Sequence, residues 1–539
     1  MAERLGGHLV AESLAALGAR TAFGVPGVHA LAIWEGLRAS TIDVVAARTE
    51  LCAGFEAEGY ARAGGTPAPL ILSTGPGALN SLSAVMEAAC AHVPMVAISS
   101  QIPSDLIGRG RGYLHELPDQ LASFAPLVKH AARAGSVESI PALLARAWQV
   151  ALTPPSGPTY LEIPVDLLRA PAGIGEVSTL EAVVERQCAP LAQVELAAAA
   201  LAHSHRPVIW AGGGVLRSGA QHELLELAQL LDAPVATTFM GKGALADDHP
   251  LAAGAGCHEA ALARLLSEAD VLLCVGSELG ERTTSDWRLP LPGRLIQLDA
   301  APERIAANYP ALPLVGDAKL TLLALAAELS GHRPRVHAGG AQRAADVRGR
   351  IDEGLRDQGR EAERGLLAAI ESALAPNAIV AFDVTILGDW AAPHMLLKAD
   401  QCFLYPLGSG TLGYALPAAI GARMAHPDRE ALAVVGDGGL SYAIAELGTA
   451  AQHGIPIKLL VIDDGGYGIP PERQRDQFSD TTAVQLPGVD VEALVGAFGG
   501  PVRGSGPDDL EATLSWALAQ PGPAAVVVHM RLVAPQPTA

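Results

Sequence analysis

The segment from Val434 to Gly468 contains two apolar runs that each lead into acidic residues, VVGDGG and LLVIDDGG. Such runs predict two buried strands, and the amphipathic stretch between them predicts a helical crossover. A right-handed crossover of this length makes the strands parallel neighbours, so Asp437 and Asp464 would meet at the carboxyl edge of one sheet. Two carboxylates that close repel each other unless a cation lies between them. Oxygen ligands combined with phosphate oxygens and water are typical of Mg²⁺.

Glycines surround the first of these aspartates. Gly436, Gly438 and Gly439 allow the backbone to approach a ligand closely, and the N–H groups that open the following helix favour an anion. A phosphate group bridged by the metal accounts for both features. A turn with capping aspartates is the alternative, because a short motif is only a hypothesis. The second Asp-x-Gly, at the next strand end, makes the metal–phosphate interpretation more specific.

Strand and helix patterns alternate along the whole chain of 539 residues, which predicts the α/β class with several domains. Weakly patterned stretches separate three units, which we expect over residues 1–170, 190–332 and 355–539.

The balance of charges limits the partners that this chain can bind. The formal net charge is −20, which argues against nucleic acid and against anionic membrane surfaces. The uncharged stretch over residues 401–422 is rich in Gly and Pro, which fits a loop opening a buried helix rather than a membrane span. The first residues do not resemble a secretory signal, so we expect a cytoplasmic protein.

The run over residues 434–468 resembles the diphosphate and metal motif of thiamin-diphosphate-dependent enzymes, in which GDG is followed by Asn or Asp after the next strand. The resemblance implies three consecutive domains, each a parallel, six-stranded type of sheet flanked by helices. These would be a pyrimidine-binding domain over 1–170, a middle Rossmann-like domain over 190–332 and a diphosphate-binding domain over 355–539. It also implies that Mg²⁺ is held by Asp437, Asp464 and the carbonyl of Gly466.

Upstream blocks match the pyrimidine-binding domain of that family: FGVPG from residue 23, RTELCAGFEAEGYAR from residue 48 and STGPGALNSLSAV from residue 73. Glu50 corresponds to the family's glutamate, a buried acid that hydrogen-bonds N1′ of the aminopyrimidine and so activates the cofactor. Thr49 stands where the family commonly has His. Without the surrounding motif, Glu50 would be interpreted as a carboxylate favoured at a helix start.

A further block, PLGSGTLGYALPAAIGA from residue 406, matches the family's loop that bends the cofactor. There Leu412 would force the bend, and the carbonyl of Gly410 would accept from the 4′-amino group. Thr385, Ile386 and Leu387 replace the family's Gly-Gln-His, so the backbone would make those contacts. Together the resemblance implies cofactor contacts from Pro26, Gly27, Glu50, Thr74, Asn80, Thr385, Ile386, Leu387, Gly410, Leu412, Gly436, Asp437, Gly438, Gly439, Asp464, Gly466, Tyr467, Gly468 and Ile469.

In that family the pyrimidine domain of one subunit faces the diphosphate domain of another. The resemblance therefore implies a homodimer or homotetramer.

The stretch GRGRGYLHELPDQ, from residue 108, is closest in wording to synthase-like decarboxylases of the guanidino-oxopentanoate type. This implies decarboxylation of a 2-oxo acid through an enamine, which is then released as an aldehyde or ligated to a second carbonyl. His115 and His29 are the candidate proton donors, because imidazole exchanges protons near neutral pH, although each could equally be a structural histidine. The expected substrate contacts are Val28, Ser73, Leu114, His115, Ile469 and Arg473.

Alternatives remain open at this point. Acetolactate synthase proper is the second enzyme hypothesis. The glycine-rich turn AGGGVLRSG from residue 211 is not GxGxxG, so we do not expect bound FAD. A non-catalytic relative, or a nucleotide-binding Rossmann-type protein, is the hypothesis of a different class.

Overall fold

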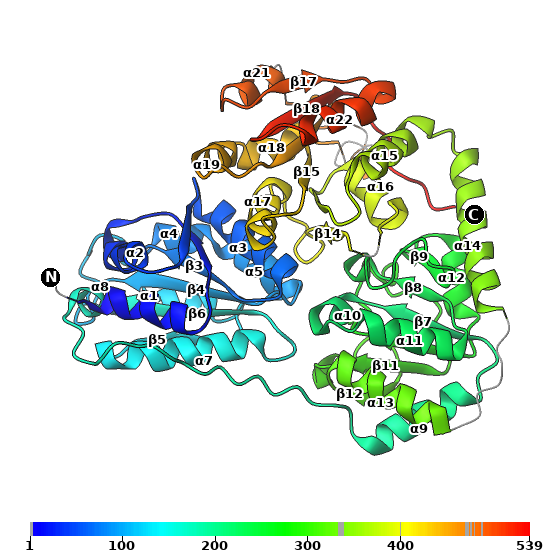
Figure 1. Cartoon of the computed structure of the whole chain (residues 1–539), viewed down its shortest axis with the longest axis horizontal. Helices are drawn as coiled ribbons and strands as arrows, with labels where there is room; N and C mark the ends of the chain where they lie inside the picture. Colours follow the sequence, from blue (N-terminus) through cyan, green and yellow to red (C-terminus); the bar gives the residue numbers. More distant parts are fainter. Residues whose placement is uncertain are drawn as a thin grey trace.

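Three parallel sheets of six strands follow one another along the chain, which confirms the predicted α/β class and sheet type (Figure 1). The computed structural model describes residues 4–331, 339–398, 400–468, 474, 477–478, 480–486 and 489–538. The three sheets define an N-terminal, a middle and a C-terminal unit. None of the helices in the described part of the chain combines the length and the apolar character that a bilayer crossing requires.

The N-terminal unit has the strand order β2-β1-β3-β4-β6-β5. Its strands are β1 (Thr21–Gly24), β2 (Asp43–Ala46), β3 (Ala68–Leu72), β4 (Met95–Gln101), β5 (Ala131–Arg133) and β6 (Pro158–Pro164). Its helices are α1 (Gly6–Ala16), α2 (Leu31–Arg38), α3 (Glu50–Gly64), α4 (Pro76–Asn80), α5 (Leu82–Cys90), α6 (Gln120–Phe124), α7 (Ile140–Leu152) and α8 (Val165–Arg169).

The middle unit has the order β12-β11-β10-β7-β8-β9. Its strands are β7 (Pro207–Ala211), β8 (Val235–Thr237), β9 (Ala252–Ala255), β10 (Val271–Val275), β11 (Leu295–Asp299) and β12 (Leu312–Val315). Its helices are α9 (Leu191–Ala202), α10 (Gly213–Ser218), α11 (Gln221–Leu231), α12 (Ala260–Ser267) and α13 (Ala318–Gly331). The charged helix α14 (Gly340–Asp357) packs against β9 and α12.

The C-terminal unit has the order β14-β13-β15-β16-β18-β17. Its strands are β13 (Ile379–Phe382), β14 (Cys402–Leu404), β15 (Ala431–Gly436), β16 (Lys458–Asp463), β17 (Val502–Gly504) and β18 (Ala524–His529). Its helices are α15 (Glu361–Ala373), α16 (Ile386–His394), α17 (Ala415–Ala425), α18 (Asp437–Ala443), α19 (Glu446–Gln452), α21 (Val491–Gly496) and α22 (Leu510–Leu518).

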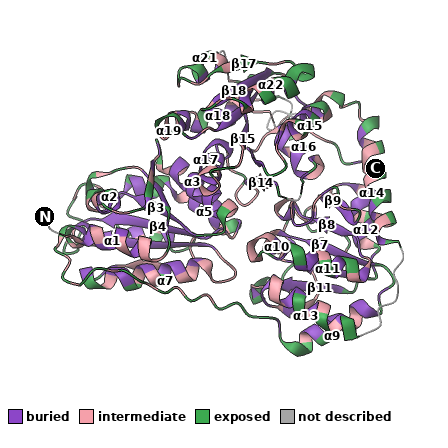
Figure 2. Ribbon diagram, viewed as in Figure 1, coloured by how far each residue is buried: buried purple, intermediate pink, exposed green. Residues whose placement is uncertain are grey.

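The central strands of each sheet contribute buried residues to the hydrophobic cores of the three units. Strands β3, β4 and β6 are buried along their whole length, because helices cover both faces of a parallel sheet. Figure 2 shows the same pattern, with buried strands inside and helices whose outer faces are exposed. The outermost strands are short, and β2, β5 and β17 are largely half-buried or exposed.

The N-terminal and C-terminal units are joined by a close crossing of α3 and α17, which lie together at the centre of the molecule in Figure 1. A Cβ atom on Gly59 would lie 2.1 Å from the carbonyl oxygen of Ala418. The corresponding atom on Gly421 would lie 1.8 Å from the carbonyl oxygen of Glu56. Glycine at both positions therefore lets the two backbones touch, which fixes one unit against the other.

Candidate active site

A cavity of about 190 Å³ lies at the carboxyl ends of β13, β15 and β16. This is the edge at which open parallel sheets bind ligands. Most of the residues predicted to contact a cofactor from this half of the chain line it. The lining is Val384, Thr385, Ile386, Leu387, Leu412, Gly436, Asp437, Gly438, Gly439, Ile462, Asp464, Gly466, Tyr467, Gly468 and Leu532.

Asp437 and Asp464 lie together in this cavity, because β15 and β16 are parallel neighbours. Burial, and then the charge of Asp464, raise the pKa of Asp437 to about 6. Burial also raises the pKa of Asp464. Oδ1 of Asp437 is buried and has no hydrogen-bond partner among the described residues. Such a pair fits a divalent cation, which would satisfy the orphaned oxygen and separate the two charges.

Glycines bring the two segments of this cavity together. A Cβ atom on Gly438 would lie 2.8 Å from the ring of Tyr467, and one on Gly468 would lie 2.8 Å from a carboxylate oxygen of Asp464. Gly466 is fixed by an antiparallel bridge to Gln485. No cluster of three or more His, Cys, Asp or Glu side chains suited to a metal occurs in the described chain. A metal here would therefore use two carboxylates and a main-chain oxygen.

Asp383, which the sequence analysis did not single out, lies buried behind the cavity. Its carboxylate accepts from the backbone N–H of Gly413 and of Val384, each at 2.9 Å. A Cβ atom on Gly439 would lie 2.6 Å from the same carboxylate. Burial raises the pKa of Asp383 to about 6. Asp383 thus joins three segments around the cavity, and its place at the end of a buried strand is the signal that could have identified it.

Val384, Ile462 and Leu532 also line the cavity without having been predicted. The first two lie within two residues of predicted ones at strand ends, so proximity in sequence was a usable signal. Leu532 lies in the segment after β18, and no pattern in that segment indicates the contact.

Glu50 is the first residue of α3, a helix that Thr49 caps by accepting from the backbone N–H of Cys52 at 3.1 Å. Nδ2 of Asn80 donates to Oε2 of Glu50 at 3.2 Å. Gly77 lies against the other oxygen, where an added Cβ would be 3.1 Å away. Within one chain Glu50 is half-buried, so it is not yet the buried acid that the resemblance implies.

His29 and His115 lie together, with ring centroids 5.2 Å apart. Nδ1 of each ring is buried and has no hydrogen-bond partner within the described chain. Burial, followed by the nearby His115 and Arg169, lowers the pKa of His29. Gly75 packs on His115, because a Cβ at this glycine would lie 2.7 Å from the His115 carbonyl oxygen. The two candidate proton donors therefore form one pair. This pair lies beside Gly75, which begins the stretch that contains the neighbours of Glu50, Gly77 and Asn80.

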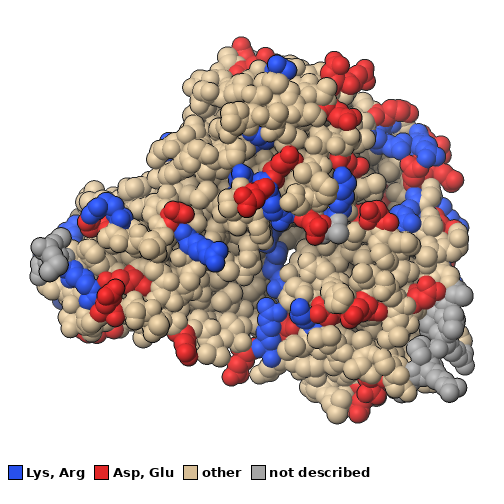
Figure 3. Space-filling view, in the orientation of Figure 1, with Lys and Arg blue, Asp and Glu red and all other residues tan. Residues whose placement is uncertain are grey.

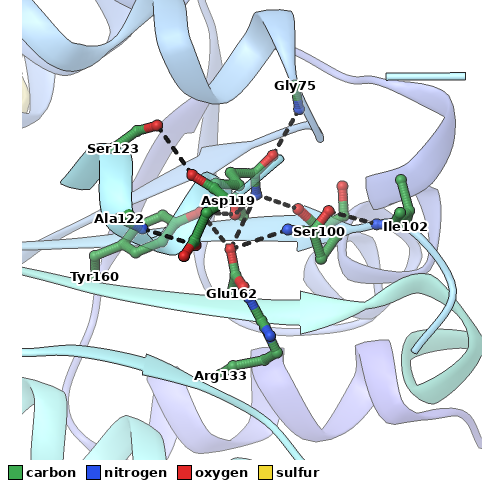
Figure 4. A network of polar contacts seen from close by, with 12 residues as sticks. Gly75, Ser100, Ile102, Asp119, Ala122, Ser123, Arg133, Tyr160 and Glu162 are labelled. Atoms are coloured by element: carbon green, nitrogen blue, oxygen red, sulfur yellow. Dashed lines mark hydrogen bonds and ion pairs between the residues drawn. The ribbon is translucent and has the colours of Figure 1, made fainter. Parts of the chain in front are cut away.

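A buried polar network holds the backbone at Gly75 in place, as Figure 4 shows around Gly75, Tyr160 and Glu162. Oε1 of Gln120 accepts from the backbone N–H of Gly75 at 2.7 Å. Nε2 of Gln120 lies 2.9 Å from the Tyr160 hydroxyl and 3.3 Å from Oε2 of Glu162. Glu162 is also paired with Arg133. Sequence reasoning did not identify Gln120, because its partners come from distant segments.

The other predicted residues of the N-terminal unit lie nearby. A Cβ on Gly27 would be 2.3 Å from Oγ of Ser73, and Oγ1 of Thr74 lies 2.9 Å from Oγ of Ser100. Pro26 is exposed.

The remaining predicted residues of the C-terminal unit are Gly410, Ile469 and Arg473. Gly410 is exposed, with a φ of +68°, and is not part of the lining. Ile469 and Arg473 lie outside the described residues.

One chain does not bring the two groups of predicted residues together. The described lining of the cavity runs from Val384 to Leu532 and includes nothing from the N-terminal unit. Large apolar side chains are exposed beside the N-terminal group, namely Val28 at 63%, Leu79 at 36% and Leu114 at 66%. Exposed apolar clusters of this kind mark interaction surfaces.

A larger cavity, of about 880 Å³, lies between the N-terminal and middle units. Figure 3 shows Lys and Arg side chains gathered in the hollow between these two units. The arginines in the lining are Arg62, Arg186, Arg217, Arg282 and Arg304. Among the described residues, none of those predicted for the site lines this larger cavity.

Three family models match successive parts of the chain. They are described as the N-terminal TPP binding domain, the central domain and the C-terminal TPP binding domain of thiamine pyrophosphate enzymes. They match residues 4–123, 194–325 and 383–528, respectively. Thiamine pyrophosphate (TPP) and thiamin diphosphate are the same compound.

Relatives of similar length were also found. The chain is 38% identical over 464 residues to a probable 2-ketoarginine decarboxylase, AruI, of Pseudomonas aeruginosa, covering 86% of this chain and 82% of the relative. It is 33% identical to a probable acetolactate synthase large subunit of Methanocaldococcus jannaschii, covering 86% and 81%. It is 30% identical to the acetolactate synthase isozyme 1 large subunit of Escherichia coli, covering 98% and 94%.

Proposed function

The chain belongs to the thiamine pyrophosphate enzyme family and is a thiamin-diphosphate-dependent lyase or carboligase. From that premise we propose that it decarboxylates a 2-oxo acid, with Mg²⁺ and the diphosphate bound in the cavity after β15 and β16. The observation that carries the proposal is the half-buried pair Asp437 and Asp464, in which the buried Oδ1 of Asp437 has no partner within the described chain.

The C-terminal unit would bind the metal and the diphosphate. Asp437, Asp464 and the carbonyl of Gly466 would hold Mg²⁺, since hard oxygen ligands suit this ion. Thiamin diphosphate, when bound, supplies the carbanion stabilisation that allows a 2-oxo acid to lose CO₂. Leu412 lines the same cavity, where it would contact the cofactor.

The N-terminal unit would move protons. The Glu50 carboxyl, positioned by Asn80, would hydrogen-bond N1′ of the aminopyrimidine. The pair of His29 and His115 would donate the proton that replaces CO₂ in an aldehyde product, because each ring has a buried nitrogen without a partner in the described chain.

We propose that two chains share each site, as a homodimer or homotetramer. Two observations support this: the cavity lining in one chain lacks Glu50, and exposed Val28 and Leu114 flank the histidine pair. A second chain whose cavity faces Glu50 would cover these apolar side chains and bury the carboxylate.

The substrate is proposed as a 2-oxo acid with a guanidino side chain. This is supported by the similarity to the probable 2-ketoarginine decarboxylase and by the sequence around His115. Acetolactate synthesis from pyruvate is the second candidate, which the two synthase relatives favour.

The test is to incubate the protein with thiamin diphosphate, Mg²⁺ and a panel containing 5-guanidino-2-oxopentanoate, pyruvate and benzoylformate, and then to measure CO₂ and identify the product. An aldehyde from the guanidino acid supports the first proposal. Acetolactate from pyruvate supports the second. Absence of CO₂ with every member of a broad panel would support the non-catalytic alternative.

We also propose that no flavin is required, because the glycine-rich turn after β7 lacks GxGxxG. Flavin content should be measured directly, because the larger cavity is lined by arginines, which suit the phosphate groups of a nucleotide. Flavin absorbance in the supernatant of the denatured protein would contradict the proposal.

A further inference from the structure

The segment over residues 405–414 carries two predicted cofactor contacts, Gly410 and Leu412. Only Leu412 of the two lines the smaller cavity. The segment contains two glycines in the left-handed region, Gly410 with φ +68° and Gly413 with φ +77°. Such a backbone is not fixed by regular secondary structure, so its shape depends on the side chains that hold it.

Glu87, on α5 of the N-terminal unit, holds the middle of this segment. Its side chain is fully buried. Oε2 accepts from the backbone N–H of Ser409 at 2.6 Å and from the Ser409 hydroxyl at 2.7 Å. Oε1 accepts from the backbone N–H of Gly408 at 3.3 Å. One carboxylate therefore binds two consecutive residues just before Gly410.

Arg62 and Glu58, on α3, contact the two ends of the 405–414 segment. Arg62 donates to the carbonyl oxygen of Tyr405 at 2.9 Å and lies 3.2 Å from Oε1 of Glu87. Glu58 accepts from the Tyr414 hydroxyl at 2.6 Å and lies 2.7 Å from the Arg62 side chain. The side chains of Arg62 and Glu58 are 5% and 0% exposed, so water does not screen these contacts.

These contacts all run from the N-terminal unit to the C-terminal unit of the same chain. Asp383 also holds the segment, through the backbone N–H of Gly413 at 2.9 Å, but it belongs to the C-terminal unit itself. The contacts that fix the segment against the N-terminal unit come from Glu87, Arg62 and Glu58. A neutral amide at position 87 would direct an NH₂ group at donors, so the charge itself is part of the arrangement.

We propose that Glu87, supported by Arg62, is a positioning residue that shapes the 405–414 segment for the cofactor, and so sets the affinity of the site. This inference rests on the proposed function. Helix α3 would then contribute to two sites. Its first residue, Glu50, would contact the cofactor bound to the C-terminal unit of a second chain, whereas Arg62 in its last turn would shape the cofactor site of its own chain.

The test compares Glu87→Gln with a matched control, Asp247→Asn. Asp247 is also a buried carboxylate that joins a cation, Lys242 at 3.0 Å, to a backbone N–H of the C-terminal unit, that of Leu397 at 2.9 Å. It does not contact the 405–414 segment. For each full-length variant, calorimetry gives the dissociation constant for thiamin diphosphate with Mg²⁺. Hydrogen exchange of the cofactor-free protein reports the order of residues 405–414.

Glu87→Gln is expected to weaken cofactor binding by about tenfold or more and to speed exchange in the segment by a similar factor, whereas Asp247→Asn stays within about twofold on both. Ser409→Ala removes only one contact and is expected to weaken binding by about threefold, and it decides the matter if Glu87→Gln does not fold. The proposal is overturned if the Glu87 or Ser409 variants match the parent on both readouts, or if Asp247→Asn has the same effect. If the parent itself binds no thiamin diphosphate, the proposed function fails, and exchange in the cofactor-free protein still decides whether Glu87 orders the segment.

Discussion

Replacing Gln120 by leucine removes the amide that ties Gly75 to the centre of the N-terminal sheet. The buried N–H of Gly75 loses the acceptor that lies 2.7 Å away, at an expected cost of about 1 to 3 kcal/mol. Nε2 has only two hydrogens for its several nearby acceptors, so at most two further bonds are lost, each contributing about 1 kcal/mol. Glu162 keeps its contacts with Arg133 and Gln101. The buried leucine offsets part of the loss, which leaves a destabilisation of roughly 3 kcal/mol.

The variant is expected to lower kcat/KM as well, because Gly75 packs on the backbone of His115. The assays are urea unfolding, hydrogen exchange at Gly75 and steady-state kinetics with the substrate found in the panel. Gln297→Leu is the control, since Gln297 is a buried amide that accepts from Ala306 at 2.9 Å and donates to Ser277 at 3.1 Å in the middle unit. An unchanged exchange rate at Gly75, or an equal loss of kcat/KM in the control, would refute the reasoning.

Three other outcomes are expected. Glu50→Gln should lower kcat by about 10² to 10⁴-fold while thiamin diphosphate still binds, and steady-state kinetics with near-parental activity would contradict the role given to Glu50. Asp437→Ala should abolish the Mg²⁺-dependent binding of thiamin diphosphate that is measured by gel filtration, and removing Mg²⁺ from the parent with a chelator should do the same. Asp464→Asn should still bind the cofactor, because an amide oxygen can bind the ion. Asp383 has a folded-state pKa of about 6 against an ordinary 3.8, so the folded chain binds a proton that the unfolded chain releases. Relative to Asp383→Asn, the parent should therefore lose roughly 3 kcal/mol of stability as pH rises from about 4 to about 6, and a difference in unfolding free energy that does not vary with pH would contradict this.

The sequence predicted the interior of the fold better than its edges. The central strands are long apolar runs, and each of β3, β4, β15, β16 and β18 was expected from its residues. Five of the outermost strands, β5, β9, β12, β14 and β17, were not, because they are only three or four residues long and several are half-exposed, so little apolar pattern marks them.

The candidate site shows the same division. Asp437 and Asp464 could be paired from the sequence because one crossover fixes their strands as neighbours. Gln120 and Glu87 act through segments far away in the sequence, and no local pattern reports such contacts. Asp383 lies between these cases: it ends a buried strand, as Asp437 does, but its partners are the N–H groups of other segments.

The most direct test of a site shared between two chains is a mixed assembly of Glu50→Ala and Asp437→Ala chains, carrying different affinity tags and purified through both. Each uniform variant should be inactive, because every site lacks either the acid or the metal ligand. The mixed dimer should regain about half of the parental activity, since one of its two sites combines an intact Glu50 with an intact Asp437. A mixed assembly as inactive as the uniform variants would contradict the account.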